Sequence, residues 1–302
     1  MNADTPAIRI TDLTVRYGRK TAVDGASLTV PRGSVYALLG RNGAGKSSLV
    51  RCTLGQMKPT NGRAEIFGSD VWAQRATLMD RVGVVSEEAD APPEMTVHDI
   101  ATFSSQLYSR WNQSDVDARL RRFGLDGRSR FGALSKGQKK QVMLAMTLGM
   151  SPELLILDDP TLGLDVVAKK SLFEEVISEL ADRGITVFIT THDLGPVEAI
   201  ADRVGVLKDG RIVLDEEVET LKARFRRIRF GTQPMALANA SLVAATVRQW
   251  GSSGTEAVVT NYDDVAFERF RSSANLTTAD VTPMSLEEIF IAVAGEHEGA
   301  QS

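Results

Sequence analysis

A glycine-rich segment at residues 40–48 has the composition of a phosphate-binding loop. Glycines let the backbone turn its N–H groups toward phosphate oxygens, a lysine adds positive charge, and a serine hydroxyl can ligate Mg²⁺. The segment directly follows the apolar run at residues 35–39, and a helix that begins at Lys46 would add the positive end of its dipole. The sequence therefore predicts a nucleoside triphosphate site formed by Gly40, Arg41, Asn42, Gly43, Ala44, Gly45, Lys46, Ser47 and Ser48, with Ser47 as a Mg²⁺ ligand.

Two carboxylates, Asp158 and Asp159, end the apolar run at residues 154–157. In phosphate-loop proteins this position holds Mg²⁺ and activates water. We predict that Asp158 holds the metal through a water molecule and that Asp159 is a catalytic residue. In isolation the pair would indicate only an acidic turn before Pro160, and its place downstream of a phosphate loop favours the catalytic interpretation.

A second candidate anion site lies at residues 134–138, which read Leu-Ser-Lys-Gly-Gln and precede a basic amphipathic helix. On its own this segment is typical of a helix start capped by serine. A serine hydroxyl, a glycine N–H and a helix N-terminus can also bind an anion together. The site would be formed by Ser135, Gly137 and Gln138, which lie too far along the chain to serve the same phosphates within one subunit.

Composition narrows the class of protein. The chain has 302 residues, 43% hydrophobic and 25% charged, which fits either one large globular domain or a large domain that carries a small appendage. A net charge of -4 gives no general attraction to nucleic acid, so no nucleic-acid partner is expected. The single cysteine, Cys52, cannot form an internal disulfide and is expected to be a small buried residue on the first helix. Three histidines and one cysteine show no zinc-ligand spacing.

The chain shows neither the apolar core of a signal peptide nor a window of about 18 apolar residues. We therefore expect a cytoplasmic protein. It would lie peripherally on the cytoplasmic face of the cell membrane through a partner.

The elements that must position these residues follow from periodicity. Short β-rich runs at residues 8–10, 13–17 and 27–30 predict an antiparallel layer. Later strands alternate with helical patterns, which predicts a parallel sheet, and the predicted strands are residues 82–85, 154–157, 186–190 and 204–208.

Two further regions differ from this alternation. Residues 88–149 are mostly helical in pattern and predict a helical subdomain inserted in the sheet. After Leu214 the pattern indicates a helix that begins at residues 215–217 and ends near Phe225. Apolar residues alternate with polar ones after this helix, and together the two patterns predict a small α+β appendage. Its last helix is indicated by a capping box at residues 285–288.

The order of the motifs resembles that of an ATP-binding cassette (ABC) ATPase over residues 6–215. The chain contains its motifs in the order that is typical of the family. They are the phosphate loop, the helical insert, Leu-Ser-Lys-Gly-Gln, Asp-Asp-Pro, Gly-Leu-Asp at residues 163–165 and Thr-Thr-His-Asp at residues 190–193. The resemblance implies an α/β P-loop fold whose mixed sheet carries an antiparallel layer and a helical subdomain at about residues 88–150. The expected domains are a cassette at residues 1–215 and a C-terminal accessory region at residues 216–302.

The same resemblance implies a head-to-tail dimer in which ATP and Mg²⁺ lie between one phosphate loop and the partner's residues 134–138. Tyr17 then matches the aromatic residue that stacks on adenine, Asp165 lies in the dimer-contact loop, and His192 senses the γ-phosphate. A homodimer is the simple expectation, and a heterodimer is the alternative.

Two positions depart from the family's pattern, and both belong to the part of the site that carries out hydrolysis. The catalytic base is commonly glutamate, and here Asp159 is one methylene shorter, so its reach is in question. The family usually has glutamine where this chain has Glu87, which adds negative charge near the metal. We hypothesise that Glu87, as a catalytic residue and metal ligand, partly compensates for Asp159 by ordering water or tightening Mg²⁺ binding. Glu88 is a weaker candidate for that role.

The basic run at residues 222–229 has two interpretations. It is either a solvated face or a contact for anionic lipid head groups or a membrane partner.

The chain looks similar to ATP-binding subunits of bacterial ABC-2 type exporters. Three features carry this resemblance, namely the segment at residues 285–290, the Leu-Ser-Lys-Gly-Gln variant and the basic run. This implies an ATP-hydrolysing subunit that drives a separate integral membrane permease, which would dock on the helical subdomain and residues 87–97. The alternatives are a soluble ABC ATPase that acts on a ribosome or DNA, and a low-turnover regulatory subunit of a heterodimeric transporter.

Overall fold

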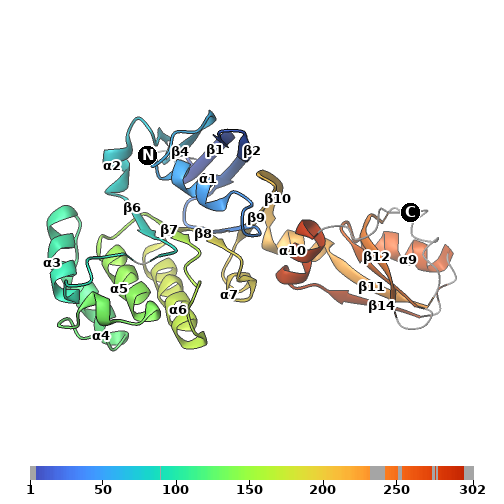
Figure 1. Ribbon diagram of the computed structural model, residues 1–302. Coiled ribbons are helices and arrows are strands. Elements are labelled where there is room, and N and C mark those ends of the chain that lie inside the picture. The colour runs from blue at the N-terminus through green and yellow to red at the C-terminus, as the bar shows by residue number, and fades with distance from the viewer. Residues whose placement is uncertain are drawn as a thin grey trace. The chain divides into compact units, whose positions relative to one another are not determined.

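The computed structural model describes residues 5–88, 90–231, 242–250, 254–273, 276 and 278–295 (Figure 1). The chain divides into two compact units, Met1–Ala201 with Leu207–Ile212 and Asp202–Val206 with Val213–Ser302. The division passes through β9 (Arg203–Lys208) and β10 (Arg211–Glu217). The domain boundary at residue 215 stays a prediction.

An antiparallel sheet of order β2-β1-β4-β5 forms one layer of the first unit. The two runs predicted at residues 8–10 and 13–17 are one strand, because a register shift between Ile10 and Leu13 lets the pairing with β2 continue. Asp12 lies in this irregularity with φ 47°. The strands are β1 (Ile8–Tyr17), β2 (Lys20–Val30), β4 (Asn61–Ile66) and β5 (Ser69–Asp70).

The second sheet brings the chemically active segments to one edge. Its strand order is β10-β9-β3-β8-β7-β6, and the neighbouring pairs β3·β8, β8·β7 and β7·β6 are parallel. Since parallel strands end at the same edge, the segments that follow β3, β7 and β8 lie close together. Their registers pair Leu39 with Thr191 and Asp158 with Thr190. The strands are β3 (Val35–Leu39), β6 (Val82–Val85), β7 (Leu154–Asp158) and β8 (Thr186–Thr191).

Helices α3, α4 and α5 lie together with their own apolar core (Figure 1). Thr96 and Ser135 cap α3 and α5 through reciprocal capping boxes. Val97, Val116 and Val142, one from each helix, are fully buried in that core. The helices of this unit are α1 (Lys46–Thr53), α2 (Arg75–Met79), α3 (Val97–Leu107), α4 (Gln113–Arg122), α5 (Lys136–Gly149), α6 (Val166–Arg183) and α7 (Leu194–Glu198), with a short 3₁₀ helix at Phe131–Ala133.

A buried ion cluster joins α4 to α6. The Arg119 guanidinium bonds Glu175 and Glu179 of α6 and, at 3.1 Å, Asp115 of its own helix. Arg183 at the end of α6 reaches back to Asp115 at 2.8 Å. The cluster therefore fastens the helical segment to the helix that follows the Asp158-Asp159 loop.

The second unit contains an antiparallel sheet of order β12-β13-β11-β14. Ile228 and Phe230 of β11 pack against Phe267 and Phe270 of α9. The strands are β11 (Arg226–Phe230), β12 (Ala244–Trp250), β13 (Gly254–Val259) and β14 (Ala279–Pro283), and the helices are α8 (Val218–Arg224), α9 (Asp264–Ser273) and α10 (Leu286–Ala294).

Two predictions for this unit had different outcomes. The helix expected to open at residues 215–217 begins instead at Val218, because those acidic residues complete β10. The capping box that starts the last helix is confirmed, since Ser285 Oγ accepts from the Glu288 N–H and Glu288 accepts from the Ser285 N–H. Parts of the predicted appendage within residues 232–302 lie outside the described residues.

The arginines of the basic run at residues 222–229 find partners inside the second unit, and the two interpretations offered above stay predictions. Arg226 donates to a backbone carbonyl and its guanidinium lies 5.5 Å from the centre of the Tyr262 ring. The ion pairs are Arg224 with Glu216 at 2.6 Å, Arg227 with Glu288 at 2.7 Å and Arg229 with Glu256 at 2.8 Å. The guanidinium groups thus serve the fold of this unit.

Within the described part of the chain, every helix is too short or too polar to traverse a lipid bilayer.

Cys52 is 1% exposed on α1, as its position predicted. Burial raises the pKa of its thiol to about 11, so the reactive thiolate is scarce at neutral pH. We expect Cys52 in the native protein to resist a chromogenic disulfide reagent at pH 7.5 and to react in full after urea unfolding. Rapid reaction of the native protein would contradict a thiol enclosed by the fold.

Candidate nucleotide site

The predicted phosphate loop connects β3 to α1 and is held in a strained shape that glycine permits. Gly45 has φ 111°, and a Cβ there would lie 2.3 Å from the carbonyl oxygen of Ala22. The Lys46 side chain folds back over the loop, and its Nζ donates to the Gly40 carbonyl at 2.8 Å. The loop is therefore preformed, with a buried ammonium at its centre.

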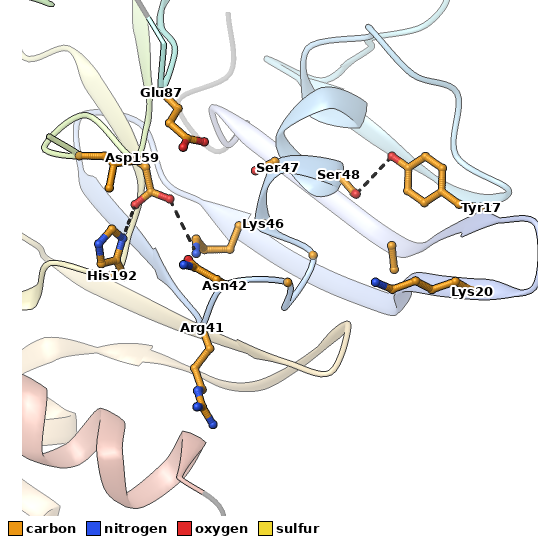
Figure 2. A pocket seen from close by; sticks show the side chains of 14 residues that line it. Tyr17, Lys20, Arg41, Asn42, Lys46, Ser47, Ser48, Glu87, Asp159 and His192 are labelled. Carbon is orange, nitrogen blue, oxygen red and sulfur yellow. Dashed lines mark hydrogen bonds and ion pairs between the residues drawn. The ribbon is translucent and has the colours of Figure 1, made fainter. Parts of the chain in front are cut away.

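A cavity of about 400 Å³ opens over this loop (Figure 2). Eight of the predicted nucleotide residues line it, whereas Gly40 and Ala44 of the same loop do not. The lining residues are Tyr17, Lys20, Ala22, Arg41, Asn42, Gly43, Gly45, Lys46, Ser47, Ser48, Glu87, Asp159, Leu162 and His192. Lys20, Ala22 and Leu162 carry no motif and were missed by the sequence analysis.

The three predicted catalytic residues meet in this cavity although they follow three different strands. Asp159 Oδ2 lies 3.8 Å from Lys46 Nζ, and Asp159 Oδ1 lies 3.0 Å from His192 Nδ1 (Figure 2). Glu87 follows β6 and also lines the cavity. The arrangement can bind phosphate through Lys46 and can accept a proton from water through Asp159.

Asp158 is placed differently from its neighbour. Its Oδ1 accepts a hydrogen bond from the Thr190 hydroxyl, and its side chain does not line the cavity. Burial raises the pKa of Asp158, an effect that the Thr190 hydrogen bond opposes and the negative charge of Asp159 reinforces. Since its carboxylate stands back from the cavity, a contact with a metal ion would pass through water, as the sequence analysis expects.

Tyr17 lies at the rim of the cavity, near the amino-terminal turn of α1. Its hydroxyl is 3.3 Å from Ser48 Oγ and donates to the sulfur of Met57 at 3.2 Å. The side chain is 47% exposed and lines the cavity.

The three residues of the second predicted anion site, on α5, lie outside this cavity. Ser135 and Gln138 satisfy each other's backbone N–H groups, at 3.2 Å and 3.0 Å, in the capping box of α5. Gly137 packs so closely against α6 that a Cβ there would lie 3.2 Å from the Cβ of Ala168. Within one chain these residues cap a helix, and they do not reach the phosphate loop.

Lys140 is a residue that the sequence analysis did not single out. It is 3% exposed on α5, and its Nζ donates to the carbonyl oxygens of Asp159 at 3.0 Å and Pro160 at 2.9 Å. Helical spacing with the buried Leu144 and Leu148 was the signal that could have placed it on the buried face.

The chain is similar to known proteins in sequence and in structure. A family model described as "ABC transporter" matches residues 23–162. The bacitracin transport ATP-binding protein of Bacillus licheniformis is 34% identical over 73% of this chain and 72% of its own. A fluoroquinolones export ATP-binding protein of Mycobacterium tuberculosis is 32% identical over 96% of this chain and 94% of its own, so that alignment extends well beyond the cassette.

Among solved structures, an ATP-binding subunit of an ABC transporter is similar with a TM-score of 0.66 and 27% identity. It covers 72% of this chain and 92% of that one. The chain therefore belongs to the ABC transporter family, among its ATP-binding proteins. The predicted α/β fold class and the resemblance are confirmed, and the chain is an ATPase of this family.

Proposed function

We propose that this chain binds and hydrolyses ATP for an exporter, in a dimer of cassettes that drives a separate membrane permease by closing around Mg-ATP. The convergence of Lys46, Asp159 and His192 in one cavity carries this proposal. The name of the fluoroquinolones export relative supports export as the direction.

In the proposed reaction, Lys46 and the loop N–H groups bind the phosphates, and Asp159 accepts a proton from the attacking water. His192, which contacts Asp159, would bond the γ-phosphate and orient that carboxylate. Tyr17 would stack on the adenine base. Each of these roles uses the position that the side chain already has beside the cavity (Figure 2).

The oxygen atoms around the cavity fit a magnesium ion. Ser47 and Glu87 line the cavity, whereas Asp158 does not line it and accepts a hydrogen bond from the Thr190 hydroxyl. In the described part of the chain no three side chains of His, Cys, Asp or Glu cluster as a metal site, so the nucleotide phosphates would complete the shell, as is usual for Mg²⁺. The ion would neutralise charge on the transferred phosphoryl group.

Replacing Glu87 with glutamine tests the hypothesis that this carboxylate compensates for the short Asp159. We expect the Mg²⁺ concentration for half-maximal turnover to rise by about three- to tenfold, because one negative charge near the metal is lost. ATPase assays across a Mg²⁺ titration measure this, with Glu94→Gln as an exposed control. Unchanged turnover and Mg²⁺ dependence, beside an inactive Asp159→Asn variant, would reject the hypothesis.

The surface beside the cavity supports a second cassette as a partner. Leu162 is an exposed apolar residue there, and Val166 and Val167, at the start of α6, are 82% and 78% exposed. Exposed apolar residues at one place are typical of an interface. Ser135 and Gly137 would then bind the partner's nucleotide. We favour a homodimer, and a heterodimer with a glutamate-bearing relative is the alternative.

A groove of about 410 Å³ supports a permease as the other partner. It is lined by α2, β6, α3 and α5, and its floor is rich in methionine, whose flexible side chains adapt to an inserted helix. The apolar lining includes Met79, Leu107, Met143, Met146 and Met150. Residues 87–97, the other half of the expected socket, do not line this groove.

An affinity pull-down from gently solubilised cells tests the proposal. Tagged Asp159→Asn protein is purified with Mg-ATP, and co-purified chains are identified by mass. Recovery of a polytopic membrane protein supports the exporter. Recovery of ribosomal or DNA-bound material without one would favour a soluble ABC ATPase.

A further inference from the structure

Lys140 carries a buried ammonium whose hydrogen-bond partners, as the structure describes them, are two backbone carbonyls of the loop after β7. A charged group is costly to bury, so it is expected to have a role that an apolar side chain could not fill. The carbonyls belong to Asp159 and Pro160, the first two residues of that loop. The ammonium therefore acts directly on the backbone that carries the Asp159 side chain.

The Asp159 backbone is held at both ends of the residue. Its N–H donates to the Thr190 carbonyl at 2.9 Å, and its own carbonyl accepts from Lys140 Nζ and, at 3.2 Å, from the Leu162 N–H. The residue has φ 42°, a left-handed conformation that is uncommon for residues other than glycine. Such a conformation persists when its surroundings hold it in place.

This conformation decides where the carboxylate points. With the peptide fixed, Asp159 Oδ2 lies 3.8 Å from Lys46 and Oδ1 lies 3.0 Å from His192. Because the aspartate side chain is short, a small backbone rotation would carry its oxygens away from these groups, and a misplacement of about 1 Å can cost about a hundredfold in rate.

We propose that Lys140 is a positioning residue for ATP hydrolysis, whose ammonium locks the Asp159 backbone so that the short carboxylate reaches the site. The inference rests on the proposed catalytic role of Asp159. Lys140 lies four residues after Lys136, on the helix whose first turn carries Ser135 and Gly137.

Replacing Lys140 with methionine keeps the unbranched side chain and removes the ammonium. We expect kcat for ATP to fall by about ten- to a hundredfold. KM and the affinity for a fluorescent ATP analogue should stay within about twofold, because the phosphate loop is untouched. Lys140→Arg should recover part of the loss. Lys170→Met, at an exposed position on α6, is the matched control and should leave kcat unchanged.

A double-mutant cycle separates positioning from general damage. If Lys140 acts through Asp159, Lys140→Met should cause no further loss in single-turnover hydrolysis when Asp159 is already asparagine. An additive loss would overturn the proposal, as would a kcat for Lys140→Met within twofold of the wild type beside an inactive Asp159→Asn. If the methionine variant does not fold, Lys140→Gln, which keeps a donor, is measured in the same cycle. If Asp159→Asn stays active, the role of Asp159 and this inference both fail.

Discussion

Replacing Asp159 with asparagine is expected to lower the rate of ATP hydrolysis by about a hundredfold or more, because an amide cannot take a proton from the attacking water. ATP binding should persist, since Lys46 and the loop around it are unchanged and the amide oxygen still faces His192. Steady-state phosphate release measures the first effect, and equilibrium binding of a fluorescent ATP analogue measures the second.

Asp159→Glu is the matched control because it restores the carboxylate that the family commonly has. We expect it to retain turnover within about tenfold of the wild type, and an increase would show that the reach of Asp159 limits the rate. An asparagine variant that hydrolyses ATP at a rate close to the wild type would remove Asp159 from the proposed mechanism.

Replacing Arg119 with leucine is expected to destabilise the first unit by about 2–3 kcal/mol, because Glu175 and Glu179 would lose their shared buried cation and keep only Arg122 and Arg183, one each. The Arg119 side chain is 5% exposed, and its guanidinium contacts both carboxylates and Asp115. Urea unfolding followed by tryptophan fluorescence is a direct measurement, since Trp111 packs in the core of the same helical segment.

Two variants show whether this loss comes from the buried charges. Arg128→Leu, whose side chain is 93% exposed and pairs with Asp126 at the surface, should change the stability by less than about 1 kcal/mol. Adding Glu175→Gln and Glu179→Gln to the leucine variant should recover part of the loss. A small effect of Arg119→Leu alone would contradict this role and mean that Arg122 and Arg183 are sufficient to neutralise the two glutamates.

Local pattern was sufficient to name most of the described residues that line the cavity, and the reason is topological. Lys46, Asp159 and His192 each follow an apolar strand, and parallel strands bring the segments after them to one edge. The strand runs at residues 8–10 and 13–17 were read as two because a bulge at Asp12 breaks the alternation while the pairing continues.

The sequence pattern could not predict the contacts between residues that lie far apart along the chain. Lys140 and Asp159 are 19 residues apart, and local sequence rules do not predict that the Lys140 ammonium on α5 donates to a carbonyl after β7. The partners of the basic run at residues 222–229 are distant in the same way. They include Glu256 and Glu288, and composition alone does not predict these ion pairs.

The enclosure of Cys52 gives the molecule a practical property. Because this is the single cysteine of the chain and it lies inside the fold, the native protein presents no thiol of its own to a labelling reagent. A cysteine placed at the exposed Val167 would be the lone reactive position and could carry a spin label or a fluorophore. In a homodimer one such substitution supplies two probes, whose separation would follow the opening and closing of the assembly during turnover.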